Sequence, residues 1–493
     1  MLRPSSPSPA QRAALATALV ARYAEIVDAP QALQASLVKP LPMTLWANPL
    51  RINRDELQTL LSADGLQGKA VPWHPDALRL PADSRPGLHW TFLTGLSRIQ
   101  EEVSMLPVML LQPQPGERVL DLCAAPGSKT AQMAVAMADS GTLVANDSKR
   151  GRIAALRQMI KRLGLVSCSV TVRDGQGVDR RAGLFDRVLV DAPCSCEGTF
   201  RKVRVPEAVT MELRRRSAAI QMRLLRRAVA LTRPGGRLVY STCTFAPEEN
   251  EAVVDAMLRA HPDTLRLRQV HVPGLQAAPG ISRWQDQSFL PEISRCLRIW
   301  PHQQDTGGFF VAVLDRIDGT DTPDQTTPFS PPMESSDWLR PLTERFGIPK
   351  SAFDGVTLIR RGNRHVHALS DGHLAPYAPA PEMLGLPVIR RKSLPLKPTT
   401  SAVLRWGRHA TRNRIDLDAP QRDAFLRRHT CLVTAEQRTD CTGPGYVIVR
   451  FAGYVIGLGQ LIFDRESPQV RLLSLVPKAW ALDAGVQSPT GDD

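Results

Sequence analysis

Several residues able to bind a ligand or act as nucleophiles come directly after short apolar runs of the sequence. Five such residues end five successive runs: Asp121, Asp147, Asp174, Asp191 and Cys243. If the runs form parallel strands of one sheet, their carboxyl ends lie at the same edge, which is where open α/β sheets bind ligands. One carboxylate at a strand end is often only solvated. Four of them together with a thiol predict a ligand-binding crevice.

The turn after Asp121 has the composition of a cofactor-binding loop. Small or turn-forming residues occupy it and a helical pattern begins at its end: Cys123, Ala124, Ala125, Pro126, Gly127, Ser128 and Lys129. Small side chains let the backbone approach a ligand, and the first N–H groups of a helix are free to bind it. A phosphate-binding P-loop would need glycine at the positions of Cys123 and Ser128, so we discount that alternative.

Asp147 is the candidate ribose acceptor. It comes 26 residues after Asp121, at the end of the second predicted strand. Nucleotide-binding sheets carry an acidic residue roughly 20 residues beyond the first turn, and its carboxylate binds the ribose hydroxyl groups. The spacing therefore favours a ligand that contains a ribose.

Two cysteines, Cys194 and Cys243, follow the fourth and fifth predicted strands, and a rigid proline turn after Asp191 presents the first of them. Thiols that share a crevice with a basic residue such as Lys129 have the surroundings of reactive cysteines. None of the eight cysteines has the C-x-x-C spacing of a structural zinc site, so we expect no metal. Inert, buried thiols are expected for the cysteines outside these stretches: Cys168, Cys296, Cys431 and Cys441.

Strands and helices alternate through the middle of the chain. Strands are expected at residues 119–122, 142–145, 167–172, 185–190 and 237–241, and helices at 129–137, 151–163, 217–231 and 248–259. Apolar runs at 294–299 and 308–314 predict final antiparallel strands, and residues 96–112 predict an apolar helix before the sheet. This βαβ series predicts a Rossmann-like, doubly wound α/β sheet.

The sheet is expected to form the central one of three domains. The predicted units are a small α/β domain over residues 1–95, the sheet domain over 96–316, a linker over 317–336 and an arginine-rich α+β domain over 337–493. The linker is assigned because Thr, Pro, Asp and Ser dominate it.

The 493 residues carry a net charge of +14 and give a pI near 9.8. This balance favours an anionic partner, with nucleic acid as the leading candidate, although a basic protein can also be merely soluble. The sequence has no apolar run long enough to span a bilayer, and its N-terminus lacks the apolar core of a signal peptide. We therefore expect a cytoplasmic protein without a membrane partner.

These stretches resemble those of the Sun-type RNA (cytosine-5) methyltransferases. The resemblance covers roughly residues 35–315 in unbroken order and is carried by residues 99–105, 121–130, 191–194, 241–244, 247–251 and 307–310. Within the family, residues 127–129 and 199–202 are most similar to the bacterial 16S ribosomal RNA enzymes. The C-terminal part more weakly resembles the PUA-like RNA-binding extension of those enzymes.

The resemblance implies methyl transfer from S-adenosylmethionine to carbon 5 of an RNA cytosine, giving 5-methylcytosine in ribosomal RNA. Carbon 5 is a poor nucleophile until a thiolate adds to carbon 6. By resemblance Cys243 is that nucleophile and Cys194 assists the elimination that frees the product. Asp191 would bind the cytosine edge and the cofactor. Residues 123–129 would hold the methionine end of the cofactor, Asp147 its ribose and Asp174 its adenine, while the target base leaves its stack.

Cys196 departs from the family pattern, in which glycine usually follows the Pro-Cys-Ser turn. Glycine permits a positive φ at this position, whereas any other residue adopts it only at a cost. We therefore expect strain next to Cys194 and a third, oxidation-prone thiol near the site.

Other functions compete with this one. A non-catalytic RNA-binding or ribosome-assembly protein could keep the fold, but the intact Cys194, Cys243 and Asp191 argue against it. DNA cytosine methyltransferases use the Pro-Cys cysteine as the nucleophile and usually lack the Thr-Cys cysteine, so the presence of both argues against that class. A tRNA cytosine-5 methyltransferase stays open, because RNA specificity lies in surface shape.

Overall fold

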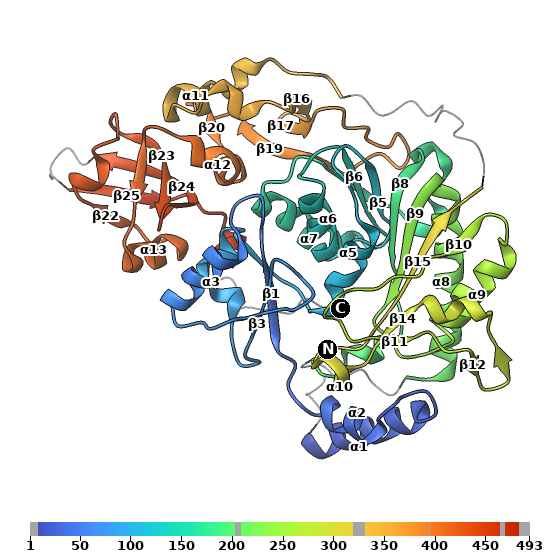
Figure 1. Cartoon of the computed structure of the whole chain (residues 1–493). Helices are drawn as coiled ribbons and strands as arrows, with labels where there is room; N and C mark the ends of the chain where they lie inside the picture. The colour runs from blue at the N-terminus through green and yellow to red at the C-terminus, as the bar shows by residue number, and fades with distance from the viewer. Residues whose placement is uncertain (1–7, 203–208, 319–330, 394, 464–468, 483–493) are drawn as a thin grey trace.

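The computed structural model describes residues 8–202, 209–318, 331–393, 395–463 and 469–482. In Figure 1 the central sheet, teal to yellow, lies beside an N-terminal region, blue, and a C-terminal region, orange to red. Most of the predicted linker, residues 319–330, lies outside the described residues. Among the described helices, none is long and apolar enough to cross a membrane.

The central sheet has ten strands in the order β11-β14-β15-β9-β8-β5-β6-β7-β18, with β10 beside β15. Its five parallel strands are β5 (Arg118–Asp121), β6 (Thr142–Asp147), β7 (Cys168–Val172), β8 (Phe185–Asp191) and β9 (Thr232–Thr242). The predicted doubly wound sheet is confirmed. The direction of winding reverses between β5 and β8, which is the switch point where such sheets bind ligands.

Antiparallel strands extend the sheet beyond β9. They are β15 (Phe309–Arg316), β14 (Leu297–Ile299), β11 (Ala278–Pro279) and β10 (Leu265–Leu267), followed outside the sheet by the hairpin β12 (Arg283–Trp284) and β13 (Gln287–Ser288). β15 runs antiparallel to β9, as predicted. β14 pairs antiparallel with its two neighbours, β15 and β11, so the strand in the run predicted at 294–299 has the same direction as β9.

Alternate side chains of the strands enter two different cores. Leu120 and Val188 pack in one core with α8 (Met211–Leu231) and α9 (Glu251–Ala260). Their neighbours Val119 and Leu189 pack in the other with α5 (Leu106–Leu111), α6 (Ser128–Ala136) and α7 (Arg150–Leu163). Successive side chains of a strand point to opposite faces, so short continuous apolar runs suit a sheet that helices cover on both sides.

The prediction of a helix over residues 96–112 is wrong for the first half of that range. Residues Ser97–Ile99 form strand β4, which pairs with β1 of the N-terminal region, and the helix α5 begins only at Leu106. Pro107 explains the late start, because proline has no N–H to donate and fits only the first turn of a helix.

The N-terminal region contains a four-stranded antiparallel sheet in the order β2-β3-β1-β4. Its elements are α1 (Pro9–Tyr23), α2 (Pro30–Leu37), β1 (Met43–Ala47), α3 (Arg54–Ala63), β2 (Lys69–Ala70), β3 (Ala77–Leu80) and α4 (Trp90–Leu93). Helices α1 and α2 lie apart from this sheet and pack into the same core as α8, at the bottom of Figure 1.

The C-terminal region contains a four-stranded and a five-stranded sheet. Their strands are β16 (Val356–Arg361), β17 (His365–Ser370), β19 (Leu386–Arg390) and β20 (Lys397–Pro398), then β21 (Arg414–Asp416), β22 (Cys431–Val433), β23 (Gly445–Phe451), β24 (Tyr454–Phe463) and β25 (Val470–Ser474). Its helices are α11 (Arg340–Phe346), α12 (Thr400–Trp406) and α13 (Ala419–Leu426). The PUA-like character of this region stays a prediction.

The C-terminal region is joined closely to the rest of the chain. Its strand β18 (Met383–Leu384) pairs with β7 and so extends the central sheet. Arg405 forms an ion pair with the buried Asp139, and Arg157 pairs with Glu382 at 2.6 Å. One apolar core also unites side chains of the N-terminal sheet with those of β23 and β24. The N-terminal and C-terminal segments thus share an apolar core, and the predicted domain boundaries stay a prediction.

Candidate active site

The parallel strands bring the predicted crevice residues to one edge of the central sheet. Asp121, Asp147 and Asp191 are the last residues of β5, β6 and β8, and Cys243 follows β9 directly. The register of β8 and β9 places Asp191 opposite Ser241. The shared edge is as predicted from the sequence, and the strand order shows that it includes the switch point between β5 and β8.

Asp147 fixes the turn over residues 123–129. Its Oδ2 accepts a hydrogen bond from the N–H of Ala125 at 3.1 Å, and Arg152 donates to the carbonyl oxygen of Ala125 at 2.6 Å. Gly127 caps α6 with a φ of 115°, and a Cβ at this position would collide with side chains of α7. The turn therefore has the tight bend and the helix N-terminus expected of a loop that binds a ligand through its backbone.

Asp121 is the buried carboxylate of the crevice. Its Oδ2 accepts a hydrogen bond from the Thr130 hydroxyl at 2.6 Å, while its buried Oδ1 has no donor among the described residues. Burial raises the pKa of Asp121 to about 7; the charges of Asp191 and Asp147 add to this rise, and the Thr130 hydroxyl opposes it. A cationic ligand would relieve the repulsion. The site fits S-adenosylmethionine in this respect, because that cofactor carries an ammonium and a sulfonium group.

Asp191 lies between two donors that come from different segments. Lys129 Nζ approaches its Oδ2 to 2.6 Å, and the Ser241 hydroxyl donates to its Oδ1 at 2.8 Å. Lys129 also donates to the Ser104 hydroxyl at 2.9 Å. The side chain of Asp191 is 30% exposed, so its carboxylate remains open to a ligand. This ion pair connects the turn after β5 to the strand that leads to Cys194.

The two cysteines predicted to be reactive lie side by side. Cys194 Sγ is 3.5 Å from Cys243 Sγ and 3.9 Å from Cys196 Sγ. All three are free, half-buried thiols. The adjacent strands β8 and β9 both end here, which brings together residues that are far apart in sequence. A candidate nucleophile and a second thiol that can donate or accept a proton thus lie next to each other in the crevice.

The three thiols differ in acidity because they are hydrogen-bonded to one another. Hydrogen bonds with Cys194 and Cys243 lower the pKa of Cys196. Hydrogen bonds to the same two neighbours, together with burial, raise the pKa of Cys194 far above its usual range. The hydrogen bond with Cys194 lowers the pKa of Cys243, but the bond with Cys196 and burial raise it by more. Of the three thiols, Cys196 is therefore the one whose pKa is lowered, whereas the pKa values of Cys194 and Cys243 are raised.

Cys196 has the strained backbone that its position in the motif predicts. Its φ is 60° and its ψ 22°, in the left-handed region, where residues other than glycine are uncommon. Its Sγ lies 3.3 Å from the carbonyl oxygen of Cys194. The strain is therefore local to the turn that presents Cys194, as expected from the sequence.

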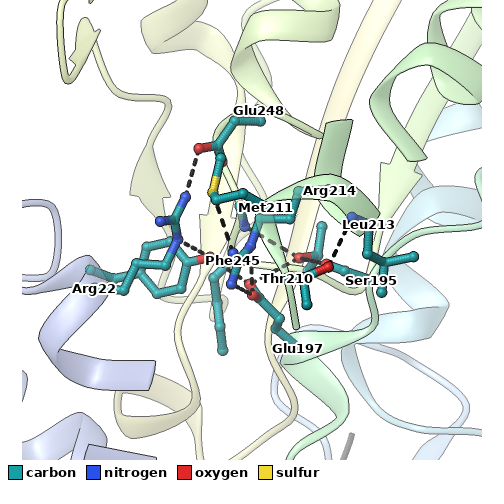
Figure 2. A network of polar contacts seen from close by, with 12 residues as sticks. Arg22, Ser195, Glu197, Thr210, Met211, Leu213, Arg214, Phe245 and Glu248 are labelled. Atoms are coloured by element: carbon teal, nitrogen blue, oxygen red, sulfur yellow. Dashed lines mark hydrogen bonds and ion pairs between the residues drawn. The ribbon is translucent and has the colours of Figure 1, made fainter. Parts of the chain in front are cut away.

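Glu197 anchors the far side of this turn through a buried network, which Figure 2 shows from close by. Arg214 of α8 donates two hydrogen bonds to its Oε1, at 2.6 and 3.0 Å. Its Oε2 accepts from the Tyr23 hydroxyl at 2.6 Å and from the Thr244 hydroxyl at 3.2 Å. Glu197 is only 2% exposed, so these four donors replace the water that a carboxylate otherwise requires.

Glu249 anchors the near side of the turn. It accepts hydrogen bonds from both the backbone N–H and the hydroxyl of Ser195, and Gln221 donates to its Oε2 at 2.9 Å. Burial raises the pKa of Glu249 to about 7, although its hydrogen bonds oppose the rise. Residues 247–251 were part of the resemblance, but no role followed from their sequence. The acidic run after Cys243 was the only sequence signal of this anchor.

Two glycines allow the backbone segments around the cysteines to touch. The N–H of Gly198 donates to the carbonyl oxygen of Cys243 at 2.8 Å, and the N–H of Gly308 donates to the carbonyl oxygen of Gly198 at 2.8 Å. A Cβ on Gly198 would lie 2.2 Å from the Gly308 oxygen. Glu101 accepts a hydrogen bond from the N–H of the neighbouring Gly307 at 2.9 Å. The motifs at residues 99–105 and 307–310 therefore support the cysteine turn from behind.

Asp174 lies apart from the buried part of the crevice. It is exposed, and its Oδ1 accepts a hydrogen bond from the N–H of Gln176 in its own loop at 3.0 Å. Its predicted contact with an adenine stays a prediction. The cysteines expected to be inert are buried at Cys168, Cys296 and Cys431, while Cys441 is half-buried.

Comparison with protein families gives two matches. The family described as 16S rRNA methyltransferase RsmB/F matches residues 108–315. The RsmF/B-like, ferredoxin-like domain matches residues 15–84, which contain α3 and the strands β1 to β3. The first match includes the turn after β5 and all three thiols of the crevice.

Individual proteins and a solved structure are similar over long stretches. The tRNA (cytosine(49)-C(5))-methyltransferase of Pyrococcus abyssi is 37% identical over 300 residues, which cover 60% of this chain and 94% of that protein. The ribosomal RNA small subunit methyltransferase F of Aeromonas salmonicida is 32% identical over 458 residues, covering 87% of this chain and 90% of that protein. The crystal structure of a methyltransferase homolog protein from Pyrococcus horikoshii is 31% identical, with a TM-score of 0.56, and covers 64% of this chain and 100% of that chain.

Proposed function

The chain belongs to the family of RNA (cytosine-C5)-methyltransferases, and we propose that it transfers a methyl group from S-adenosylmethionine to carbon 5 of a cytosine in 16S ribosomal RNA. One observation carries the chemistry: the sulfur atoms of Cys194 and Cys243 lie 3.5 Å apart at the ends of adjacent strands. The Asp191–Lys129 ion pair lies at the same edge of the sheet. This arrangement supplies a nucleophile, a second thiol and a polar contact for the base.

Cys243 begins the proposed reaction. Its thiol first loses its proton to solvent; the thiolate then adds to carbon 6 of the cytosine and forms a sulfur–carbon bond, while the electron pair of the ring double bond moves toward carbon 5. Asp191, oriented by Lys129 and Ser241, binds the polar edge of the base. Residues 123–129 and Asp147 would hold S-adenosylmethionine, which would supply the electrophilic methyl group and leave as the thioether S-adenosylhomocysteine. Carbon 5 would then carry both the new methyl group and its original proton.

Cys194 acts in the second half of the reaction. The proton on carbon 5 leaves to solvent in the half-buried crevice, the double bond re-forms and the bond between carbon 6 and the Cys243 sulfur breaks. The raised pKa of Cys194 keeps its proton in place. Its S–H group can therefore donate a hydrogen bond to the departing Cys243 thiolate and speed the elimination.

Ribosomal RNA is favoured over tRNA by how far the similarity extends. The Aeromonas rRNA enzyme matches 87% of this chain, whereas the Pyrococcus tRNA enzyme matches 60%. The longer match extends into the C-terminal region, where a determinant of RNA choice outside the catalytic sheet would lie. A tRNA substrate is the second candidate, because the tRNA enzyme has the higher identity over the part that it shares.

A basic surface on β17 and β19 supports RNA binding by the C-terminal region. Arg364 and Arg390 are exposed at the paired ends of these strands, and Lys392 is exposed next to them. Burial lowers the pKa of the neighbouring His365, and the positive charges of Arg390, Lys161 and Arg364 lower it further. Cations gathered in this way attract phosphate groups, and each contact makes binding more sensitive to salt.

Bisulfite sequencing tests the substrate. The purified full chain, S-adenosylmethionine and either small ribosomal subunits, naked 16S rRNA or tRNA are incubated, with the Cys243→Ala variant as the control. We expect one protected cytosine in 16S rRNA that the variant does not produce. Protection of a tRNA cytosine alone would favour the second candidate, and protection of neither RNA would refute the proposed activity.

The basic surface has its own test. The double substitution Arg364→Glu and Arg390→Glu should weaken RNA binding. It should also make the slope of log affinity against log salt shallower, by the contribution of about two phosphate contacts. Arg266→Glu, on the exposed side of β10, serves as the matched control. An unchanged slope in the double variant would remove this surface from the RNA interface.

A further inference from the structure

We propose that Cys194, Cys196 and Cys243 form a binding site for a thiophilic metal cation of the zinc type, and that the bound cation blocks the nucleophile. The three Sγ atoms all lie within 4.8 Å of one another. They belong to free, half-buried thiols, so a cation in solution can reach them. Three sulfur ligands that converge on one point are the donor set that zinc and other soft cations prefer.

The distances between the sulfur atoms suit a single cation. Zinc binds thiolate sulfur at about 2.3 Å in a tetrahedron, and two ligands of such a tetrahedron lie about 3.8 Å apart. The observed separations are 3.5 Å for Cys194 to Cys243 and 3.9 Å for Cys194 to Cys196. These two distances already match that geometry, and the third, between Cys196 and Cys243, is at most 4.8 Å, so a shift of no more than about 1 Å would place all three sulfurs around one ion, with water completing the coordination.

Cys196 is the residue that turns a catalytic pair into a three-sulfur cluster. Its side chain lies at the cluster only because its backbone adopts a φ of 60°. Strain of this kind persists where the surroundings hold it, and here Ser195 and Glu197 are both anchored by buried hydrogen bonds.

Metal binding at this place would be inhibitory rather than structural. Zn²⁺ displaces the thiol protons, which pass to the buffer, and forms three Zn–S bonds without any change in oxidation state. One of those bonds uses the electron pair with which Cys243 would attack carbon 6 of cytosine. This inhibitory consequence rests on the proposed function, whereas the binding site itself does not.

Cobalt(II) provides a direct probe of the site. The full chain is reduced, its thiols are counted and it is titrated with Co²⁺ without oxygen, while the thiolate-to-cobalt charge-transfer band and the visible bands of a tetrahedral ion are recorded. We expect one Co²⁺ per chain with thiolate bands, and displacement of that ion by Zn²⁺. Cys196→Gly removes one ligand and suits the positive φ, so its affinity for Co²⁺ should fall on the order of 100-fold.

Controls separate this cluster from the other thiols and from the catalytic proposal. Cys441→Ala removes a half-buried thiol elsewhere and should leave the titration unchanged, and Cys196→Ser tests the ligand with a side chain of similar size. Zn²⁺ should inhibit methylation by the natural chain at a far lower concentration than by Cys196→Gly, and a chelator should restore activity. Absence of thiolate bands, or equal Co²⁺ affinity in the Cys196 variants, would overturn the site. A chain that binds Co²⁺ but methylates no RNA would instead refute only the proposed function.

Discussion

Replacing Arg214 by methionine tests whether the buried network positions the catalytic turn. The substitution removes the cation that pairs with Glu197 but keeps a long apolar side chain in the same space. The side chains of Arg214 and Glu197 are 7% and 1% exposed, so water cannot replace the lost donors. Only the hydroxyl groups of Tyr23 and Thr244 would remain bonded to the carboxylate.

The expected cost follows from the charge that is left behind. Breaking a buried ion pair by removing one partner costs about 3–5 kcal/mol. Because two hydroxyl donors remain on Glu197, the cost of Arg214→Met should lie near the lower end of that range. We expect the free energy of unfolding to fall by about 3 kcal/mol, which is roughly a 150-fold change in the folding equilibrium. Glu197→Gln combined with Arg214→Met removes the stranded charge and should recover part of that loss.

Chemical denaturation followed by circular dichroism measures the change, with Arg215→Met as the control on the exposed side of the same helix. At temperatures at which Arg214→Met is folded, methylation assays should show a lower kcat and an unchanged affinity for the cofactor. This is expected because the network contacts the cysteine turn and not residues 123–129. The reasoning would be refuted if Arg214→Met and Arg215→Met unfolded at the same denaturant concentration. It would equally fail if the double variant were less stable than Arg214→Met alone.

Four further substitutions test the crevice itself. Cys243→Ala should abolish both methylation and any covalent adduct, whereas Cys194→Ala should accumulate a protein–RNA adduct that survives denaturing electrophoresis; the reverse pattern would exchange their roles. Asp147→Ala should weaken S-adenosylmethionine binding by on the order of 1–3 kcal/mol in calorimetry, and unchanged affinity would remove it from the cofactor site. The pKa of Asp121 is raised to about 7, so affinity for the cationic cofactor should fall up to about tenfold per pH unit below that value. The Asp121→Asn variant should lose this pH dependence. If its cofactor affinity changed with pH in the same way as that of the natural chain, the assignment would be contradicted.

The sheet and its crevice were predictable because their determinants are local. Each parallel strand is a short apolar run with a turn after it, and a polar residue such as Asp121 or Asp191 at its end marks the ligand edge. Parallel strands share that edge whatever the details of packing. The strain at Cys196 was predictable for the same reason, since a requirement for positive φ belongs to one residue.

Long-range partners were not predictable from the same patterns. Nothing in the sequence around Arg214 or Tyr23 indicates that both bind Glu197, because α1 and α8 meet that turn only in the folded chain. Strand β18 has two residues, too few for an apolar pattern, yet it extends the central sheet. The three thiols were expected near one site from the strand ends and from the position of Cys196, but the C-x-x-C rule gave no sign that they could share a ligand, because Cys243 comes from a different strand than its partners.

The positions of the three thiols follow from two kinds of constraint. The ends of β8 and β9 fix Cys194 and Cys243 relative to each other, because their backbones are paired up to Asp191 and Ser241. Cys196 has no strand to hold it, and a left-handed backbone would relax if its neighbours were free. They are not free: the buried carboxylate of Glu249 binds Ser195 on one side, and Glu197 is itself a buried carboxylate bound by four donors on the other. The network around Glu197 therefore carries the strain that brings the third thiol to the catalytic pair, so the stability of that network and the chemistry of the crevice depend on the same contacts.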